Sequence, residues 1–271
     1  LRIAGDRRPD VVIADANLPG IDGATVIRRI RLDAALRDVP CLLLTASTDR
    51  GLELDALDAG ADAFVSKDED LAVLLAKVSA IARRDVHGRG DRDHPDSLHG
   101  PKKILTADAD PTSGARLAGC LREDGYDIVH AHTGEEVLDL LGAQPTDCIL
   151  LDSLLPGIGV RETCRSIKAA PGLREIPLIL IGASNDAGAV LTGLADGADD
   201  FVARSERFDV LRARVRAQLR RRSFQDESRR SHDERLRHEL AAAQALAAQE
   251  LARARAALID ELEWKNSELE A

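Results

Sequence analysis

The sequence is poor in aromatic residues and contains no methionine. Phenylalanine, tyrosine and tryptophan make up 2% of the 271 residues, whereas hydrophobic residues of all kinds reach 44%. This composition is sufficient for packed cores, but the cores must be built from leucine, valine, isoleucine and alanine. A chain of this length has room for two domains of ordinary size and one additional element.

Other absences exclude whole classes of protein. No apolar run approaches the roughly 20 residues that span a membrane, and no signal peptide is visible, so we expect a cytoplasmic protein without membrane insertion. A net charge of −10 argues against a nucleic-acid binder. The four cysteines lack paired spacing and are expected to be buried, reduced thiols. Because the sequence starts at Leu1 and lacks methionine, we expect it to be a piece of a longer polypeptide.

What the sequence does contain is an internal repeat at an offset of 137 residues, without a gap. The matching pairs are Asp15 with Asp152, Leu18–Ile21 with Leu155–Ile158, Pro40 with Pro177, Gly60–Asp62 with Gly197–Asp199 and Phe64–Val65 with Phe201–Val202. The same offset pairs Thr45 with Gly182 and Lys67 with Arg204. The copies therefore share a scaffold and differ in polar side chains, which indicates one fold with two different roles.

The second copy has the pattern of alternating strands and helices. The expected strands are apolar runs at 103–107, 126–131, 148–151, 178–181 and 201–203, and the expected helices are 113–123, 134–141, 161–169 and 187–195. This alternation predicts a doubly wound α/β fold with a parallel sheet, whose site lies at the carboxyl ends of the strands. Asp108 and Asp152 stand at two of those ends, so we expect their carboxylates to converge there.

The chain divides into four predicted parts. Residues 1–84 form an incomplete first copy, because the offset places its first strand, first helix and second strand before Leu1; the apolar edge at 11–14 is therefore expected to be exposed. Residues 85–101 are a polar linker, and residues 102–220 are the complete second copy. Residues 221–271 continue the last helix as a coiled-coil signalling helix.

The long helix is expected to start near Phe208 and to meet no proline or glycine before Ala271. Its apolar stripe follows steps of four and three residues through Leu236, Leu240, Ala243, Ala247, Leu251, Ala254, Leu258, Leu262, Lys265 and Leu269. A polar helix cannot bury such a stripe alone, so we expect a homodimer formed through a coiled coil. The alternative is a single helix that folds back on the two copies.

The repeated motif resembles the receiver (CheY-like) domain of two-component response regulators. An Asp-x-x-Leu-Pro-Gly segment follows a strand, a Thr-Ala pair stands 30 residues later, and Lys67 stands 52 residues after Asp15. The resemblance covers residues 1–84 and 102–220 and implies two five-stranded flavodoxin-like domains, the first truncated. It also implies that a carboxylate accepts a phosphoryl group from a phosphohistidine, on a histidine kinase or phosphotransfer protein, with the assistance of Mg²⁺.

The resemblance assigns roles to five residues of the first copy. They are Asp15 as phosphoacceptor and metal ligand, Asn17 as a metal ligand through its backbone carbonyl, Thr45 as the switch hydroxyl, Lys67 as the phosphate-binding cation and Phe64 as the aromatic switch. The acidic pair that completes the family's metal site would lie before Leu1.

The second copy departs from this pattern at three positions. Asp108 matches the first member of the acidic pair, but the second member is Ala109. Gly182 removes the switch hydroxyl, and Arg204 replaces the lysine. Mg²⁺ held by Asp108 and Asp152 is therefore expected to bind weakly or not at all, and the second copy is expected to be a pseudo-receiver that serves as a docking or dimerisation adaptor. The alternative is that Asp152 is a second phosphoacceptor.

The end of the chain suggests an output. Residues 261–271 resemble the helix that precedes the phosphoacceptor box of hybrid histidine kinases. We therefore expect a tandem-receiver module that receives a phosphoryl group on Asp15 and conveys the change through a dimeric coiled coil to a histidine kinase. No output catalytic domain lies within residues 1–271. The alternatives are the input of a diguanylate cyclase and a non-enzymatic scaffold or phosphate sink.

Overall fold

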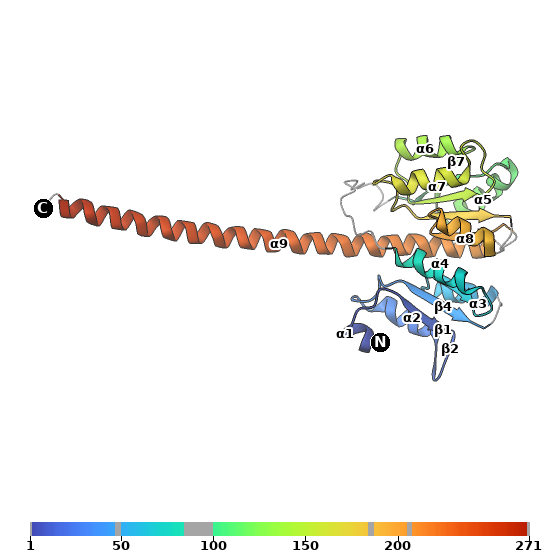
Figure 1. Cartoon of the computed structure of the whole chain (residues 1–271), viewed down its shortest axis with the longest axis horizontal. Helices are drawn as coiled ribbons and strands as arrows, with labels where there is room; N and C mark the ends of the chain where they lie inside the picture. Colours follow the sequence, from blue (N-terminus) through green and yellow to red (C-terminus); the bar gives the residue numbers. More distant parts are fainter. Residues whose placement is uncertain (1, 47–49, 84–99, 184–186, 205–207, 270–271) are drawn as a thin grey trace. The chain divides into compact units, whose positions relative to one another are not determined.

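The computed structural model describes residues 2–46, 50–83, 100–183, 187–204 and 208–269. The chain forms two compact units, residues 1–224 and 225–271. The first unit contains both repeats, here called the first repeat (1–84) and the second repeat (102–220), and the second consists of one continuing helix (Figure 1). Residues 85–99 of the predicted linker lie outside the described part of the chain.

The second repeat is built on a five-stranded parallel sheet with the strand order β10-β9-β8-β6-β7. The strands are β6 (Lys103–Ala107), β7 (Asp127–Ala131), β8 (Cys148–Asp152), β9 (Leu178–Gly182) and β10 (Asp200–Ala203). Every residue of the three strands β8, β9 and β10 is buried, which is why these segments are continuous apolar runs rather than alternating ones. The predicted doubly wound α/β fold is confirmed.

Helices cover both faces of this sheet. They are α5 (Pro111–Glu123), α6 (Gly134–Ala143), α7 (Gly159–Ala169), α8 (Ala187–Ala195) and α9 (Phe208–Leu269). Helices α5 and α9 pack on one face around Leu150, and α6, α7 and α8 pack on the other around Leu151. Successive strand residues point to opposite faces, so neighbouring leucines on β8 belong to different cores.

The first repeat has a three-stranded parallel sheet with the order β1-β4-β5. Its elements are α1 (Arg2–Asp6), β1 (Val12–Asp15), β2 (Asn17–Leu18), β3 (Ile21–Asp22), α2 (Gly23–Leu32), β4 (Cys41–Thr45), α3 (Arg50–Asp58), β5 (Ala63–Ser66) and α4 (Leu71–Ala82). Strand β1 has one sheet neighbour among the described residues, and Ile13 on it is 51% exposed, as predicted for an open apolar edge. The short β2–β3 hairpin and α1 were not predicted.

A buried arginine holds together the loops of the first repeat. Arg31 on α2 pairs with Asp62 at 2.6 Å and donates hydrogen bonds to the backbone carbonyls of Gly60, Arg37 and Val39 at 2.8–3.0 Å. Gly60 has a φ of +109°, and a β-carbon there would lie 2.7 Å from Cγ of Arg31. The repeated Gly-Ala-Asp motif is thus a structural feature that accommodates the arginine side chain.

A lysine makes the equivalent contacts in the second repeat, 137 residues later. Lys168 on α7 pairs with Asp199 at 2.7 Å and donates to the carbonyls of Arg174 and Ile176 at 2.9 and 3.0 Å. Gly197 has a φ of +110°, and a β-carbon there would lie 2.9 Å from Cγ of Lys168. The same loop is therefore stabilised by either cation.

Three of the four cysteines lie in the cores as predicted. Cys41, Cys148 and Cys164 are buried and not in disulfides, and burial raises the pKa of each thiol to about 12. Such thiols stay protonated at neutral pH and act as small apolar side chains. Cys120 is only half-buried, so the prediction of burial was wrong for that residue.

Helix α9 begins at Phe208, as predicted, and ends at Leu269. Residues 230–256 are all exposed, including Leu240 and Leu251 of the predicted stripe. The described side chains of this stripe therefore have no intramolecular cover, and a coiled coil remains a prediction. Among the described residues, none of the helices combines the length and apolarity required to cross a membrane.

Candidate functional site

The predicted site residues of the first repeat lie at the carboxyl ends of three neighbouring strands. Asp15 ends β1, Thr45 ends β4, and Lys67 directly follows β5. The strand register aligns Asp15 with Leu44, and the Lys67 backbone N–H donates to the Thr45 carbonyl at 2.6 Å. Parallel strands with this register bring the three residues to one edge of the sheet, as the sequence predicted.

Lys67 and Asp15 form an ion pair at this edge. The Lys67 ammonium donates to Oδ2 of Asp15, and the backbone N–H of Asn17 donates to Oδ1 at 3.0 Å. The hydrogen bond from Lys67 and then that from Asn17 lower the pKa of Asp15 below its ordinary value. The carboxylate is therefore ionised at neutral pH, as a nucleophile must be.

The first repeat offers Mg²⁺ ligands of the correct chemical kind. The Asp15 carboxylate and the Asn17 backbone carbonyl are hard oxygen donors, which this ion prefers. Two such ligands are fewer than an octahedral ion takes, and the described residues contain no group of three or more His, Cys, Asp or Glu side chains that could hold a metal. Residues 1–84 therefore fit Mg²⁺ in kind and supply part of its ligands.

The second repeat places three polar side chains around Asp152. Arg204 follows β10 as Lys67 follows β5, and one of its terminal nitrogens donates to Oδ2 of Asp152. Its other terminal nitrogen lies 3.0 Å from Oγ of Ser113 and 3.6 Å from Oδ2 of Asp108. Arg204 thus contacts both predicted metal ligands of this repeat. The contribution of Ser113 was not predicted from the sequence, because nothing in residues 1–84 is equivalent to α5.

The two carboxylates of this second site are much less exposed than Asp15. The side chains of Asp108 and Asp152 are 7% and 4% exposed, whereas that of Asp15 is 30% exposed. Burial, together with the neighbouring Asp152, raises the pKa of Asp108 above its ordinary value. Two buried carboxylates side by side require a positive charge, and Arg204 supplies it.

Asp110 does not replace the carboxylate that is missing at Ala109. Its side chain accepts a hydrogen bond from the backbone N–H of Thr112 at 3.0 Å and caps the N-terminus of α5. Its backbone N–H donates to Asp108 at 2.8 Å. An aspartate at this position is explained by helix capping, so it adds no ligand to the site.

The predicted switch positions also differ between the repeats. Phe201 on β10 is 4% exposed, and its ring lies directly above Gly182, where an added β-carbon would meet the ring's Cζ at 2.2 Å. At the equivalent position the first repeat has Thr45, which is buried and has a β-carbon. Phe64 therefore cannot lie over Thr45 as Phe201 lies over Gly182 unless Thr45 or the backbone moves.

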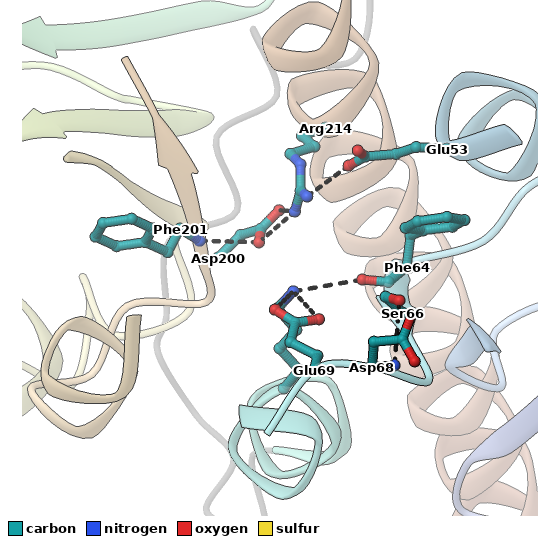
Figure 2. A network of polar contacts seen from close by, with 9 residues as sticks. Glu53, Phe64, Ser66, Asp68, Glu69, Asp200, Phe201 and Arg214 are labelled. Carbon is teal, nitrogen blue, oxygen red and sulfur yellow. Dashed lines mark hydrogen bonds and ion pairs between the residues drawn. The ribbon is translucent and has the colours of Figure 1, made fainter. Parts of the chain in front are cut away.

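A buried ionic network joins the two repeats. Arg214 on α9 lies between Asp200, which it contacts at 2.8 and 2.9 Å, and Glu53 of the first repeat (Figure 2). The three residues are 5–8% exposed. Asp200 also accepts the backbone N–H of Phe201 at 2.8 Å. This network was not predicted, since Arg214 stands in an arginine-rich stretch that is typical of a solvent-exposed helix.

Apolar contacts and arginine-to-carbonyl hydrogen bonds complete the inter-repeat interface, which comprises α3, α4, α8 and the first turns of α9. Val73 and Ala80 on α4 pack into the core that contains α8, and Leu57 on α3 packs against α9. Arg221 donates to the Ile81 carbonyl at 2.8 Å, and Arg83 donates to the Ala198 carbonyl at 2.7 Å. Helix α4, which follows Phe64 in the chain, is therefore covered by the second repeat.

Comparison with known proteins matches the response regulator receiver domain to residues 1–79 and 104–216, which is more than half of the chain. The sequence is 26% identical over 253 residues to the response regulator PleD of Caulobacter vibrioides, covering 87% of this chain and 55% of PleD. It is 41% identical over 121 residues to the transcriptional regulatory protein AfsQ1 of Streptomyces coelicolor, covering 45% of this chain and 52% of AfsQ1. The chain thus spans about half the length of these relatives.

Solved structures were also compared, and two of them each match 44% of this chain. The receiver domain of a signal transduction histidine kinase from Syntrophus aciditrophicus is 34% identical with a TM-score of 0.41, covering 44% of this chain and 89% of that one. A two-component response regulator from Clostridium difficile is 28% identical with a TM-score of 0.41, covering 44% of this chain and 97% of that one.

Proposed function

Because the chain belongs to the response regulator receiver domain family, we propose that its first repeat accepts a phosphoryl group on Asp15. The donor is a phosphohistidine on a histidine kinase or phosphotransfer protein of the cytoplasm. The observation that carries this proposal is the ion pair between Asp15 and Lys67, beside Thr45, at one edge of the sheet. A carboxylate, a cation and a hydroxyl at one point match the three demands of phosphoryl transfer.

The transfer is a displacement at phosphorus. An oxygen of the Asp15 carboxylate forms a bond to phosphorus while the bond between phosphorus and the donor imidazole nitrogen breaks, and the electron pair leaves with the imidazole. Lys67 then balances the charge of the transferred oxygens. Asp15 and the Asn17 carbonyl would be ligands of Mg²⁺, which would supply additional positive charge beside the transferred oxygens.

The response runs from Asp15 towards the inter-repeat interface. Attraction of the Thr45 hydroxyl to the new phosphoryl oxygens vacates space beside β4, into which Phe64 moves. The Phe64 carbonyl accepts a hydrogen bond from Lys77 on α4 at 3.4 Å, and Lys77 pairs with Glu69 at 3.2 Å. A shift of β5 is therefore transmitted to α4, which packs against the second repeat.

In this proposal the second repeat is a pseudo-receiver and serves as an adaptor. It presents α8 and α9 to the first repeat, and α9 continues into the second compact unit. We infer that α9 pairs with its copy in a homodimeric coiled coil, because the stripe residues Leu236 and Leu240 are 49% and 63% exposed in the single chain. A change at the interface then alters the rotation or register of the coiled coil.

The observations support three different outputs for the signal. Residues 261–271 favour a histidine kinase, whereas the similarity over both repeats to a protein called a response regulator favours a regulator with another output, such as a diguanylate cyclase. A non-enzymatic phosphate sink requires only the two repeats. Catalytic assays of the intact protein, for autophosphorylation on histidine and for cyclic diguanylate synthesis, distinguish these outputs.

The decisive experiment is Mg²⁺-dependent labelling of the intact protein with a small phosphodonor, such as acetyl phosphate, followed by mass measurement. We expect Asp15→Asn to abolish labelling and Asp152→Asn to leave it unchanged. Equal loss in both variants contradicts the division of roles, and full labelling of Asp15→Asn contradicts the assignment of the phosphoacceptor.

Dimerisation has its own test by sedimentation velocity. Leu240→Glu places a charge on the stripe and should shift the protein to a monomer. Leu246→Glu is the matched control, since Leu246 is similarly exposed at 61% but lies off the stripe. If both variants are monomers, or if neither is, the predicted stripe is not the dimer contact.

A further inference from the structure

The second repeat contains a cation in the place where its family binds a metal. The guanidinium of Arg204 contacts Asp152 and lies 3.6 Å from Asp108, so it bridges the two carboxylates that the sequence predicted as Mg²⁺ ligands. Ser113 occupies one more of its donors at 3.0 Å. Arginine is always charged, and its planar fork can contact several oxygens at once.

These residues do not fit Mg²⁺. The ion requires six oxygen ligands in a near-ideal octahedron and is strongly hydrated. Ala109 supplies no side-chain ligand, and the side chain of Asp110 caps helix α5. The guanidinium of Arg204 donates to Oδ2 of Asp152, an oxygen that a metal would have to bind. Binding of a metal would place a second positive charge beside the guanidinium, so Arg204 opposes the ion that its family requires.

The apolar half of the same site is also filled. The ring of Phe201 lies over Gly182 at a distance that leaves no room for a β-carbon. Gly193 on α8 also lies against the ring, where an added β-carbon would be 3.2 Å from Cδ2 of Phe201. A side chain enclosed in this way has one position available. Residue 182 is a glycine, so it has no hydroxyl that could move away from the ring.

The filled site is connected to the inter-repeat interface by one strand. Phe201 and Asp200 are neighbours on β10, and Asp200 binds Arg214, which in turn binds Glu53 of the first repeat. Arg204 follows the same strand one residue after its end. The position of β10 therefore determines where Arg204 lies in the site and where Asp200 lies at the surface that the first repeat contacts.

We propose that the second repeat is a metal-independent, permanently set docking domain for the first repeat. Arg204 supplies the charge that Mg²⁺ supplies elsewhere in the family, and Phe201, enclosed by Gly182, holds β10 in one position. This inference deepens the proposed adaptor role of the second repeat. It does not depend on whether Asp15 is phosphorylated.

The claim that Arg204 replaces the metal is tested by measuring metal binding to the whole chain. This chain carries Asp15→Asn, which removes the site of the first repeat. The probe is Mn²⁺, which takes the same oxygen ligands as Mg²⁺, followed through the electron paramagnetic resonance signal of the free ion. We expect no binding that depends on Asp152. Adding Arg204→Gln should raise the Mn²⁺ affinity by about tenfold or more, and Asp152→Asn should then abolish the gain.

Two results overturn this half of the proposal. One is Asp152-dependent binding of Mn²⁺ while Arg204 is present, and the other is an Arg204→Gln variant that gains no affinity. Circular dichroism establishes that the variant is folded. If Arg204→Gln is not folded, Arg204→Lys replaces it. Lysine keeps the positive charge but reaches fewer oxygens, so the Mn²⁺ affinity should rise by a smaller factor.

The apolar half is tested by hydrogen exchange in the same Asp15→Asn chain. Gly182→Ala adds a β-carbon under Phe201 and should accelerate amide exchange in α4 by about tenfold, because the docking surface shifts. Gly142→Ala adds the same atom in open space on α6 and should leave α4 unchanged. Unchanged exchange in α4 of a folded Gly182→Ala variant overturns the proposal.

General unfolding of the second repeat would be recognised by loss of protection in β6 and β8. In that event Phe201→Leu, which adds no β-carbon, replaces Gly182→Ala, and α4 should again exchange faster while β6 and β8 stay protected. Since every arm lacks Asp15, failure of the labelling experiment leaves these results intact, and their failure leaves the labelling result intact.

Discussion

The two repeats use arginine and lysine at the same two positions in opposite order. In the first repeat the loop-binding cation is Arg31 and the site cation is Lys67, whereas in the second repeat they are Lys168 and Arg204. The loop-binding position tolerates the exchange because its acceptors are backbone carbonyls and one carboxylate. They receive an ammonium as readily as a guanidinium.

The exchange has a different consequence at the site. Lys67 contacts one carboxylate and leaves the remaining directions open, whereas Arg204 contacts Asp152 and Ser113 and approaches Asp108. A compact ammonium can move aside to meet a transferred phosphoryl group, but a bridging guanidinium occupies the site itself. The same exchange is therefore expected to be tolerated at the loop-binding position and to change the chemistry at the site.

The largest effect is expected where the repeats meet. Arg214→Ala leaves Glu53 and Asp200 buried without their cation and should reduce the free energy of unfolding by about 3–5 kcal/mol. Urea denaturation of the purified chain measures it. Arg216→Ala is the control, because its pair with Asp58 is exposed at 42% and 64% and should contribute about 1 kcal/mol or less. Equal losses would show that burial does not decide the energetics of this interface.

The second effect compares the loop-binding cations. Arg31→Ala leaves the buried Asp62 unpaired and should cost about 3 kcal/mol of unfolding free energy. Arg31→Lys and Lys168→Arg should each cost about 1 kcal/mol or less, since each repeat already demonstrates the alternative. Urea denaturation distinguishes these cases. A loss from Arg31→Lys as large as that from Arg31→Ala would mean that the two positions are not equivalent.

The fold and the site of the first repeat were predictable because they depend on local pattern. Buried parallel strands are continuous apolar runs, so the order of elements followed from periodicity. The resemblance to receiver domains, which rests partly on the spacing from Asp15 to Lys67, identified the candidate site. The strands and helices were predicted in the second repeat, and the fixed offset extended that prediction to the first repeat. The Asp15–Lys67 pair followed from strand ends that share one edge of the sheet.

The missed features depend on contacts between segments far apart in the sequence. Ser113 reaches Arg204 across 91 residues, and Glu53 reaches Arg214 across 161. No periodicity or spacing encodes such pairs, since each residue alone is an ordinary polar side chain. The enclosure of Phe201 by Gly182 is similar: the glycine was visible as a lost hydroxyl, but the ring that fills its place was not.

The third effect is chemical. Lys67→Arg should lower the rate of phosphodonor labelling at Asp15 by about a hundredfold, because the larger fork covers the carboxylate that must attack. The time course of labelling in the intact protein measures it. Lys168→Arg is the control, since it makes the same exchange at the loop-binding position of the other repeat, and it should leave the rate unchanged. An undiminished rate in Lys67→Arg would mean that Arg204 does not account for the inactivity that we propose for the second repeat.

The smallest effect concerns the turn that both repeats share. Gly20 and Gly157 have φ values of +80° and +83°, so an alanine at either position should cost about 1 kcal/mol of unfolding free energy. A β-carbon at Gly20 meets nothing within 4 Å, whereas at Gly157 it would lie 2.0 Å from Oε2 of Glu135. Gly157→Ala should therefore cost more than Gly20→Ala, by the free energy needed to displace the Glu135 carboxylate.

A double-mutant cycle with Glu135→Ala isolates that difference in urea denaturation. If the carboxylate is the cause, Gly157→Ala in the Glu135→Ala background should cost the same as Gly20→Ala, because only the backbone strain remains. Persistence of the larger cost would place its origin in the turn itself. In that case the identical Leu-Pro-Gly-Ile turns would differ in backbone strain between the repeats. Identical sequence in the two turns would then not imply identical backbone conformation.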